Sequence, residues 1–278
     1  MHPLTVTFSH PTWSRIGWNN WQNFVNTGFD NILITPNQEN YRRFNKDWFV
    51  RRGMPKQAFV VGISSAIIQV AASMGIGFIC FAEEGETEYG GDTSVSRLKR
   101  FTREFLTRVY YEGQTDSEKY GKWWMVPTDN DLKNIYVTWM SRFWNWEPQD
   151  NAIFAKEHFG MEMTVGGNIG TFTNYAQNDD TAMQGLHCFM AFCKFGAGRC
   201  RSDACIEIRH GRMTRDQGVK VVNMLDGQYP VEYHDLYLDY FGMTDSEFWD
   251  VVDRHVNKSL LMPTGKIERP YVLREPCA

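Results

Sequence analysis

Short apolar runs and longer helical segments alternate through the first half of the chain. The short runs predict strands at residues 4–9, 31–35 and 77–82. Helices are expected around residues 13–26, 39–52 and 56–73. This order is typical of a parallel sheet built from βαβ units, with helices on both of its faces.

The longest uncharged run, residues 58–82, raises the question of a membrane span, which needs about 20 apolar residues. Glycine, serine and glutamine residues interrupt this run. We therefore predict a buried helix that ends near Gly75, followed by an interior parallel strand, since both are apolar all round in α/β folds.

The second half of the sequence is mainly helical. An amphipathic helix is expected within 94–113, a strand at 134–141, and a turn with a helix ended by Gly160 at 144–160. Thr214 and Thr244 each have the spacing of a capping box. We divide the chain into an α/β domain with a helical insertion near 93–125, a helical region and a loosely held tail, at 1–175, 176–260 and 261–278 respectively.

Composition and charge disfavour some classes of protein and favour others. The formal charge of -4 and the pI near 6.0 disfavour a nucleic-acid partner, because the lysines and arginines are spread out. The N-terminus has no basic segment and begins as a strand, which predicts a cytoplasmic protein without a signal peptide. The 10 Trp, 12 Tyr and 19 Phe suit a large core, a surface that stacks on sugars or a subunit interface.

The six cysteines are expected to be reduced thiols in the cytosol. Four of them lie close together in sequence with His187, so a metal site has to be weighed. Their spacings differ from the CxxC pairs that structural zinc favours. We therefore expect no zinc and no other metal held by this set: Cys80, Cys188, Cys193, Cys200, Cys205 and Cys277.

An acidic run, residues 83–92, directly follows the predicted 77–82 strand. In an open parallel sheet, ligands bind beyond the carboxyl ends of the strands. Carboxylates there could meet magnesium on a pyrophosphate or hydrogen-bond a sugar hydroxyl. The alternative is a solvated acidic loop, which is how most charge runs behave.

A glycine-rich stretch, residues 166–175, lets the backbone turn sharply or approach a ligand closely. Its hydroxyl and amide groups suit a polyhydroxylated substrate. Asp179 and Asp180 follow at the start of a predicted helix, where an acid can cap the helix or belong to a site. The sequence leaves both roles open.

A charged cluster runs from Lys194 to Arg212. Arg199, Asp203 and Glu207 are four residues apart, which on a helix predicts ion pairs along one face. Arginine is also a natural bidentate partner of phosphate, so a structural face and a phosphate site are both consistent with the spacing.

These motifs together resemble the bacterial N-acetyl sugar amidotransferases of surface-polysaccharide synthesis. The resemblance is carried by VTFSH, by FAEEGETEYGGD at 81–92, by TFTNYAQNDD at 171–180 and by GAGR with SDACIEIRHG at 196–211, and it extends to about residue 260. The chain departs from the family at Ala82 and Glu84, where glycine and asparagine are expected. The family implies a Rossmann-like PP-loop ATPase fold and a cytoplasmic enzyme.

The resemblance implies an activity and a set of residues. ATP with magnesium would activate the N-acetyl oxygen of a nucleotide-linked sugar, and ammonia delivered by glutaminase and synthase-like partners would then form the acetamidino group, for lipopolysaccharide or O-antigen synthesis. The implied catalytic residues are Glu83, Glu86, Asp179 and Asp180, and the nucleotide-pocket residues are Phe8, Ser9 and His10. The implied substrate-binding residues are Glu88, Tyr89, Gly90, Gly91, Gly167, Thr171, Thr173, Asn174, Tyr175, Lys194, Arg199, Asp203, Glu207 and Arg209.

One family element is missing from this sequence. No SGGKDS-type ATP loop is present, and the chain begins at what would be the second strand, so the absent first strand would lie in the middle of the sheet. A start placed too far downstream, a split enzyme and a degenerate paralogue would each explain this. Enzyme activity therefore stays open, and a non-catalytic paralogue or split-enzyme subunit that binds sugar nucleotide or partner proteins is the alternative. A PP-loop enzyme of tRNA thiolation or sulfate activation is disfavoured by the acidic pI and the lack of paired CxxC motifs.

Overall fold

The computed structural model describes residues 3–83, 99–111, 113, 116–143 and 145–276. The chain forms two compact units. Unit 1 comprises residues 1–9, 23–41 and 57–160, and unit 2 comprises residues 10–22, 42–56 and 161–278. Helices α1 (Arg15–Val25) and α2 (Gln38–Arg52) contribute residues to both units.

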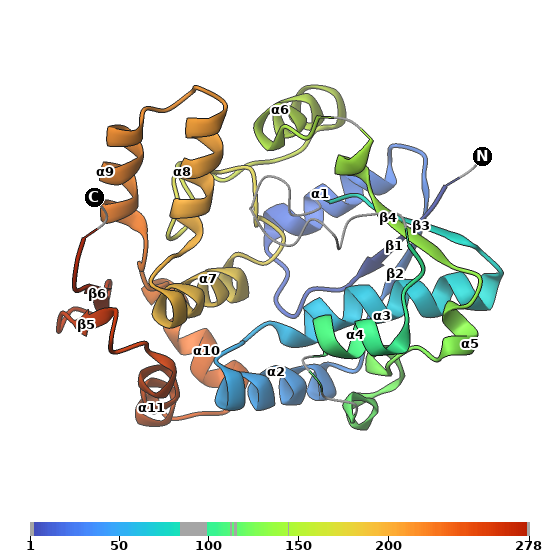
Figure 1. The fold of residues 1–278 in the computed structure, drawn as a ribbon, viewed down its shortest axis with the longest axis horizontal. Helices are drawn as coiled ribbons and strands as arrows, with labels where there is room; N and C mark the ends of the chain where they lie inside the picture. The colour runs from blue at the N-terminus through green and yellow to red at the C-terminus, as the bar shows by residue number, and fades with distance from the viewer. Residues whose placement is uncertain (1–2, 84–98, 112, 114–115, 144, 277–278) are drawn as a thin grey trace. The chain divides into compact units, whose positions relative to one another are not determined.

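Unit 1 contains two separate pairs of parallel strands (Figure 1). Strand β1 (Leu4–Phe8) pairs with β2 (Asp30–Ile34), and β3 (Phe78–Phe81) pairs with β4 (Tyr136–Trp139). All four strands lie where the sequence predicts them. The expected parallel pairing is therefore present, but these strands do not join into one continuous sheet.

Helix α3 (Gln57–Met74) is the long apolar helix of unit 1. At Gly62 a Cβ would sit 2.2 Å from the ring of Phe8, so glycine lets this helix pack directly on β1. The indole of Trp124 donates to the carbonyl of Ala58 at 2.8 Å. By length and composition α3 could cross a membrane, yet 56% of its apolar window is buried inside the molecule, as in the core helix predicted from the sequence.

The remaining helices of unit 1 are short, apart from α6. They are α4 (Arg103–Val109), α5 (Asp129–Leu132) and α6 (Pro148–Phe159), and Gly160 ends α6 in the left-handed conformation, as predicted. The helix predicted within 94–113 is confirmed only as α4, and residues 84–98 lie outside the described residues.

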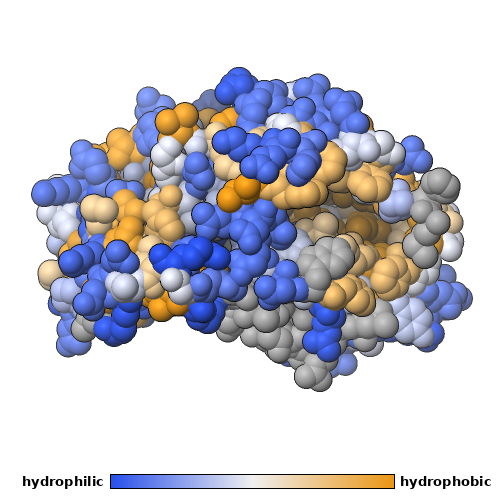
Figure 2. All heavy atoms as spheres, turned by 90° about the horizontal axis from the view of Figure 1, so that it is seen from above, coloured by the Kyte–Doolittle hydropathy of each residue, from blue (hydrophilic) through white to orange (hydrophobic). Residues whose placement is uncertain are grey.

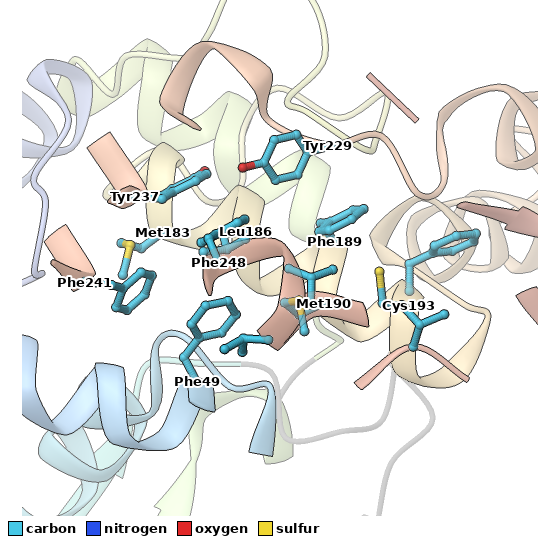
Figure 3. Packing of buried hydrophobic residues seen from close by; sticks show 14 of the residues in the cluster. Phe49, Met183, Leu186, Phe189, Met190, Cys193, Tyr229, Tyr237, Phe241 and Phe248 are labelled. Atoms are coloured by element: carbon cyan, nitrogen blue, oxygen red, sulfur yellow. The ribbon is translucent and has the colours of Figure 1, made fainter. Parts of the chain in front are cut away.

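Unit 2 is helical and is built around α7 (Thr181–Phe195). Its other elements are α8 (Arg199–Arg209), α9 (Arg215–Leu225), α10 (His234–Phe241), α11 (Asp245–His255), β5 (Leu261–Pro263) and β6 (Tyr271–Leu273). Figure 3 shows the core, in which Leu186 and Phe189 of α7 meet Phe49 of α2 and Phe248 of α11. Fully burying an aromatic or leucine side chain stabilises a fold by about 1.5–3 kcal/mol. Because α7 contributes several buried side chains to this core, it is a main source of the stability of the unit.

In unit 2 the structure confirms the two helix starts predicted from the sequence, but not the loosely held tail. Thr214 and Thr244 both form complete capping boxes, as predicted. The segment predicted to be loosely held contains the antiparallel pair β5–β6, and its Leu261 and Tyr271 are buried in the core. The prolines and mixed charges of the tail gave no sign of these two apolar anchors.

We expect Gly17→Ala in α1 to destabilise unit 2, although alanine is the better helix former. A Cβ at Gly17 would lie 2.3 Å from the Cα of Asp179, so the backbone must shift. Overpacking of this kind costs about 1–3 kcal/mol, measurable by urea unfolding. The exposed Gln22→Ala on the same helix is the control, and equal stability of the two variants would contradict the close packing.

Candidate functional site

Unit 2 has a polar pocket of about 200 Å³ beside the start of α7. Its wall consists of the glycine-rich loop that precedes α7, the first turn of α7 and the segment before α10. The polar groups that line it belong to Thr164, Asn168, Gln177, Thr181, Gln184 and Tyr233. Glu232 is the one charged residue among the lining residues, so the pocket suits an uncharged, hydroxyl-rich ligand better than a diphosphate.

The glycine-rich loop, residues 164–178, is held by its own hydrogen bonds. The amide of Asn168 donates to the carbonyl of Thr173 at 2.9 Å, and the amide of Thr164 donates to the carbonyl of Asn174 at 3.2 Å. At Gly167 a Cβ would lie 2.5 Å from the carbonyl oxygen of Thr171, so the loop closes this tightly only with glycine. These bonds fix one wall of the pocket without a ligand.

Gln177 has the only left-handed backbone of any non-glycine residue in the described part of the chain, with a φ of 65°. Such a conformation costs about 1–2 kcal/mol and persists where surrounding contacts enforce it, often at ligand sites. With its side-chain amide assigned in the orientation that satisfies both of its ends, the oxygen of Gln177 accepts from Nη1 of Arg199 at 2.8 Å. The arginine therefore holds a strained pocket residue in place.

Arg199 is in turn held by Asp203, one turn further along α8. Nε of Arg199 donates to Oδ1 of Asp203 at 2.7 Å. The other oxygen, Oδ2, accepts from the hydroxyls of Thr171 and Thr173 at 2.6 and 2.8 Å. The buried carboxylate thus ties the loop to α8 and, through Arg199, orients Gln177 at the pocket wall.

A second cation, the buried Lys56, orients the other glutamine of the pocket. Nζ of Lys56 donates to Oε1 of Gln184 at 2.8 Å, and the lysine is only 6% exposed. Burial lowers the pKa of Lys56, and the nearby carboxylate of Asp180 opposes that effect. Each glutamine thus has its oxygen engaged by a cation, while its NH₂ group, with two hydrogens, keeps donor capacity.

Asp180 caps α7, which is one of the two roles that the sequence left open. Oδ1 accepts from the amide of Met183 at 3.1 Å and from the hydroxyl of Thr12 at 2.5 Å. Burial is the main cause that raises the pKa of Asp180, and Lys56 acts against it. Asp179 is exposed next to it.

The structure gives most predicted substrate-binding residues a partner within the protein. Gly167 lines the pocket, whereas Thr171, Thr173, Arg199 and Asp203 form the network behind it. The remaining described residues of this group are placed as follows. Nζ of Lys194 donates to the carbonyl of Arg52, Glu207 binds Arg212 through both oxygens, Nδ2 of Asn174 donates to the carbonyl of Thr164, Tyr175 is half-buried and Arg209 is exposed.

The residues predicted to form a site at the carboxyl ends of the strands are brought together only in part. Phe8 and Ser9 are buried at the end of β1, and Glu83 is exposed after β3, all three in unit 1. His10 belongs to unit 2, where its ring meets that of Trp13 edge to face at 4.9 Å. Glu86, Glu88, Tyr89, Gly90 and Gly91 lie outside the described residues.

Sequence reasoning missed the residues that give the pocket its chemistry. Lys56, Gln184 and Tyr233 stand in no motif, Gln177 lies in the TFTNYAQNDD motif without having been assigned a role, and only the fold brings the four together. The one sequence feature that could have indicated a buried polar site was Lys56, a lone cation immediately before the long uncharged helix.

The cysteines gather no metal-ligand set within the part of the chain that the structure describes. No group of three or more His, Cys, Asp or Glu side chains there could hold a metal ion. Burial raises the pKa of the Cys188 and Cys193 thiols, so both are poor thiolate ligands at neutral pH. The absence of zinc stays a prediction.

A family model matches the pocket region. Residues 169–269 match the family described as LPS biosynthesis protein WbpG-like, C-terminal domain. The match covers α7 to α11 together with most of the pocket wall and the Asp203 network. It supports a relationship to WbpG-like proteins and connects this part of the chain with lipopolysaccharide biosynthesis. A comparison with curated proteins gives no match.

Acid is expected to destabilise the protein through His187, on α7. Burial, aided by the cations Lys56 and Lys194, lowers the pKa of His187 from 6.5 to about 4. Because the folded-state pKa lies below the unfolded value, stability is intact above pH 6.5 and is lost as the pH falls towards 4. Between pH 7 and pH 5 the loss is about 2 kcal/mol. Urea unfolding at both pH values measures it, and an equal loss in His187→Asn would contradict this assignment.

Proposed function

We propose that this chain acts in lipopolysaccharide biosynthesis by binding the N-acetyl sugar of a sugar nucleotide in the pocket of unit 2. The single observation that carries the proposal is the pair of glutamines, Gln177 and Gln184, whose oxygens are engaged by the half-buried Arg199 and the buried Lys56. Orienting these amide donors removes Lys56 and most of Arg199 from water, a cost that a loop without a ligand would not need. The family match, which covers Gln177, Gln184 and Arg199, supports it.

The size and polarity of the pocket favour the sugar over the rest of the nucleotide. About 200 Å³ is below the roughly 300–1,000 Å³ of pockets that enclose drug-sized ligands, so one sugar ring fits and a whole sugar nucleotide does not. Tyr233 offers an aromatic face, and the threonines, asparagine and glutamines offer both donors and acceptors. The nucleotide would extend out of the pocket.

We further propose that the bound sugar is the substrate of an ATP-dependent amidotransferase. In that reaction the oxygen of the N-acetyl group attacks ATP and releases pyrophosphate, and ammonia then displaces AMP to leave an acetamidino group. The pocket of this chain would orient the sugar for that chemistry. Glutaminase and synthase-like partners would deliver the ammonia.

The described residues beside β1 and β3 do not by themselves fit ATP. Ser9, Ala82 and Glu83 follow these strands and include no glycine-rich loop and no cation. We therefore assign no step of phosphoryl chemistry to residues of this chain. A non-catalytic sugar-binding subunit is the second candidate, and the lack of a cation and of a glycine-rich loop among the described residues at these strand ends is the observation that favours it.

Calorimetry of the purified chain tests the proposal. We expect UDP-N-acetylglucosamine, or another UDP-N-acetyl hexosamine, to bind without ATP, and Gln184→Leu to weaken this binding at least tenfold. UDP-glucose, which lacks the N-acetyl group, is the ligand control. Equal binding of UDP-glucose would contradict recognition of the N-acetyl group, and no binding of any sugar nucleotide would contradict the proposed function. ATP binding with magnesium separates the enzyme from the non-catalytic subunit.

A further inference from the structure

Exposed hydrophobic side chains occur in both units, but in different settings. Figure 2 shows hydrophobic residues around a hollow on the right, in unit 1. In unit 2, three large hydrophobic side chains instead lie at the surface where α7 ends. Phe195, the last residue of α7, is 66% exposed, and Leu260 and Met262, before and within β5, are 41% and 40% exposed. This group is separate from the sugar pocket, which lies beside the start of α7.

The end of α7 and the turn before β5 form one continuous surface. The amide of Asn257 donates to the carbonyl of Cys193 at 2.8 Å, which holds this turn against α7. A Cβ at Gly196, immediately after α7, would lie 3.4 Å from Leu260. Burial alternates along the next segment, with Leu260 and Met262 exposed on either side of a buried residue, so both point to the same outer face. The hydrophobic side chains therefore gather at one place on unit 2.

Four cations accompany these hydrophobic side chains. Nζ of Lys194 lies 5.3 Å from the centre of the Phe195 ring and donates to the carbonyl of Arg52, which is itself exposed. Nε of Arg274 donates to the carbonyl of Lys258 at 3.0 Å, and both of these residues are exposed. The four cations and the three hydrophobic side chains make up what we call the α7-end patch.

Two carboxylates offset part of this positive charge. Oδ2 of Asp253 lies 2.7 Å from Nζ of Lys258, and Glu275 follows Arg274 along the chain. The side chains of Lys258 and Asp253 are 65% and 53% exposed, so water and salt weaken their attraction. The cations outnumber the carboxylates, so the patch is positive, whereas the whole chain has a formal charge of -4. An anionic partner would therefore be attracted to this patch and not to the molecule as a whole.

We propose that the α7-end patch binds the surface of an anionic lipid bilayer. The hydrophobic side chains enter the boundary between headgroups and acyl chains, and the cations meet the lipid phosphates. Because these side chains project from a helix end and a turn instead of lining a recess, they suit the plane of a bilayer better than they suit a bound peptide. The binding is peripheral and does not depend on the sugar pocket, since the 15 residues of α7, roughly 22 Å of helix, lie between the two.

Sedimentation with lipid vesicles tests the proposal on the full chain. We expect vesicles with about 30% phosphatidylglycerol in phosphatidylcholine to bind at least about tenfold more tightly than pure phosphatidylcholine in roughly 0.1 M NaCl. Raising the salt to about 0.5 M should weaken this binding about fivefold or more, because the Debye length shortens. Phe195→Ser should weaken it about tenfold through the lost apolar contact, and Arg274→Gln about fivefold through the lost charge.

Leu236→Ser is the matched control for the lost apolar contact. Leu236 is 37% exposed on α10, where the neighbouring Tyr237 donates to the carbonyl of Ala182, about 20 Å of helix away from the end of α7. This variant should bind vesicles like the parent protein, and a melting temperature within about 2 °C of the parent shows that each variant is folded. Equal binding to both kinds of vesicle, or an equal loss in Leu236→Ser and Phe195→Ser, would overturn the proposal. Absence of vesicle binding together with self-association that Phe195→Ser abolishes would assign the patch to a second copy of the chain and would overturn it too.

Discussion

Asp203→Ala should cause the largest loss of stability of any single substitution in the pocket network. The carboxylate is 2% exposed and accepts from Arg199, Thr171 and Thr173. Its removal leaves a largely buried guanidinium and two hydroxyls without their acceptor. Breaking a buried pair in this way costs about 3–5 kcal/mol. We expect the melting temperature to fall by roughly 10 °C in differential scanning calorimetry.

Two further variants distinguish the loss of this buried hydrogen-bond network from a general loss of negative charge. Asp203→Asn keeps the shape and one acceptor oxygen, so it should lose less than alanine does. Glu268→Gln removes an exposed carboxylate in the same unit and should change stability by less than about 0.5 kcal/mol. A melting temperature of Asp203→Ala within 2 °C of the parent protein would show that the network does not hold the loop.

Lys56→Met should separate binding from stability. Nζ of Lys56 holds Oε1 of Gln184 at 2.8 Å, and a hydrogen bond to a charged group contributes about 1.5–3 kcal/mol. Without it Gln184 can turn away, so we expect the affinity for the UDP-N-acetyl sugar to fall about 10–100-fold. Methionine restores the apolar volume and ends the cost of burying the ammonium, and Asp180, which loses a nearby cation, keeps its hydrogen bonds from Thr12 and Met183, so the melting temperature should fall less than in Asp203→Ala.

The exposed Lys220→Met on α9 controls for the loss of a positive charge. It should leave sugar affinity unchanged, because it lies outside the residues that line the pocket. If Lys56→Met bound the sugar as tightly as the parent protein, the orienting role of the buried lysine would be wrong. If Lys220→Met lost affinity equally, long-range attraction of the phosphates would explain both results.

The sequence predicted most helices and strands because their signals are local. Alternating short and long apolar segments located β1, β2, β3 and α3 to within a few residues, and the capping boxes at Thr214 and Thr244 are complete. The one-face pattern of Arg199, Asp203 and Glu207 predicted their helix. It also predicted the Arg199–Asp203 pair, while Glu207 instead binds Arg212.

The candidate site could be predicted only in part, because its contacts connect distant residues. Lys56 meets Gln184 across 128 positions, and no spacing rule connects them. Thr171 and Thr173 were expected to face a substrate, but their hydroxyls satisfy a buried carboxylate, a choice that depends on burial. The separation of the four strands into two pairs likewise became visible only from the strand pairing in the structure.

The central claim is that the pocket of unit 2 holds the N-acetyl sugar, and hydrogen exchange with mass spectrometry tests it most directly. Exchange is compared in the free protein and with saturating UDP-N-acetylglucosamine. We predict slower exchange in residues 164–185 and 231–234, the two segments that form the pocket wall, and little change in β5 and β6. Protection confined to other segments, or no protection at a concentration where calorimetry detects binding, would contradict the account.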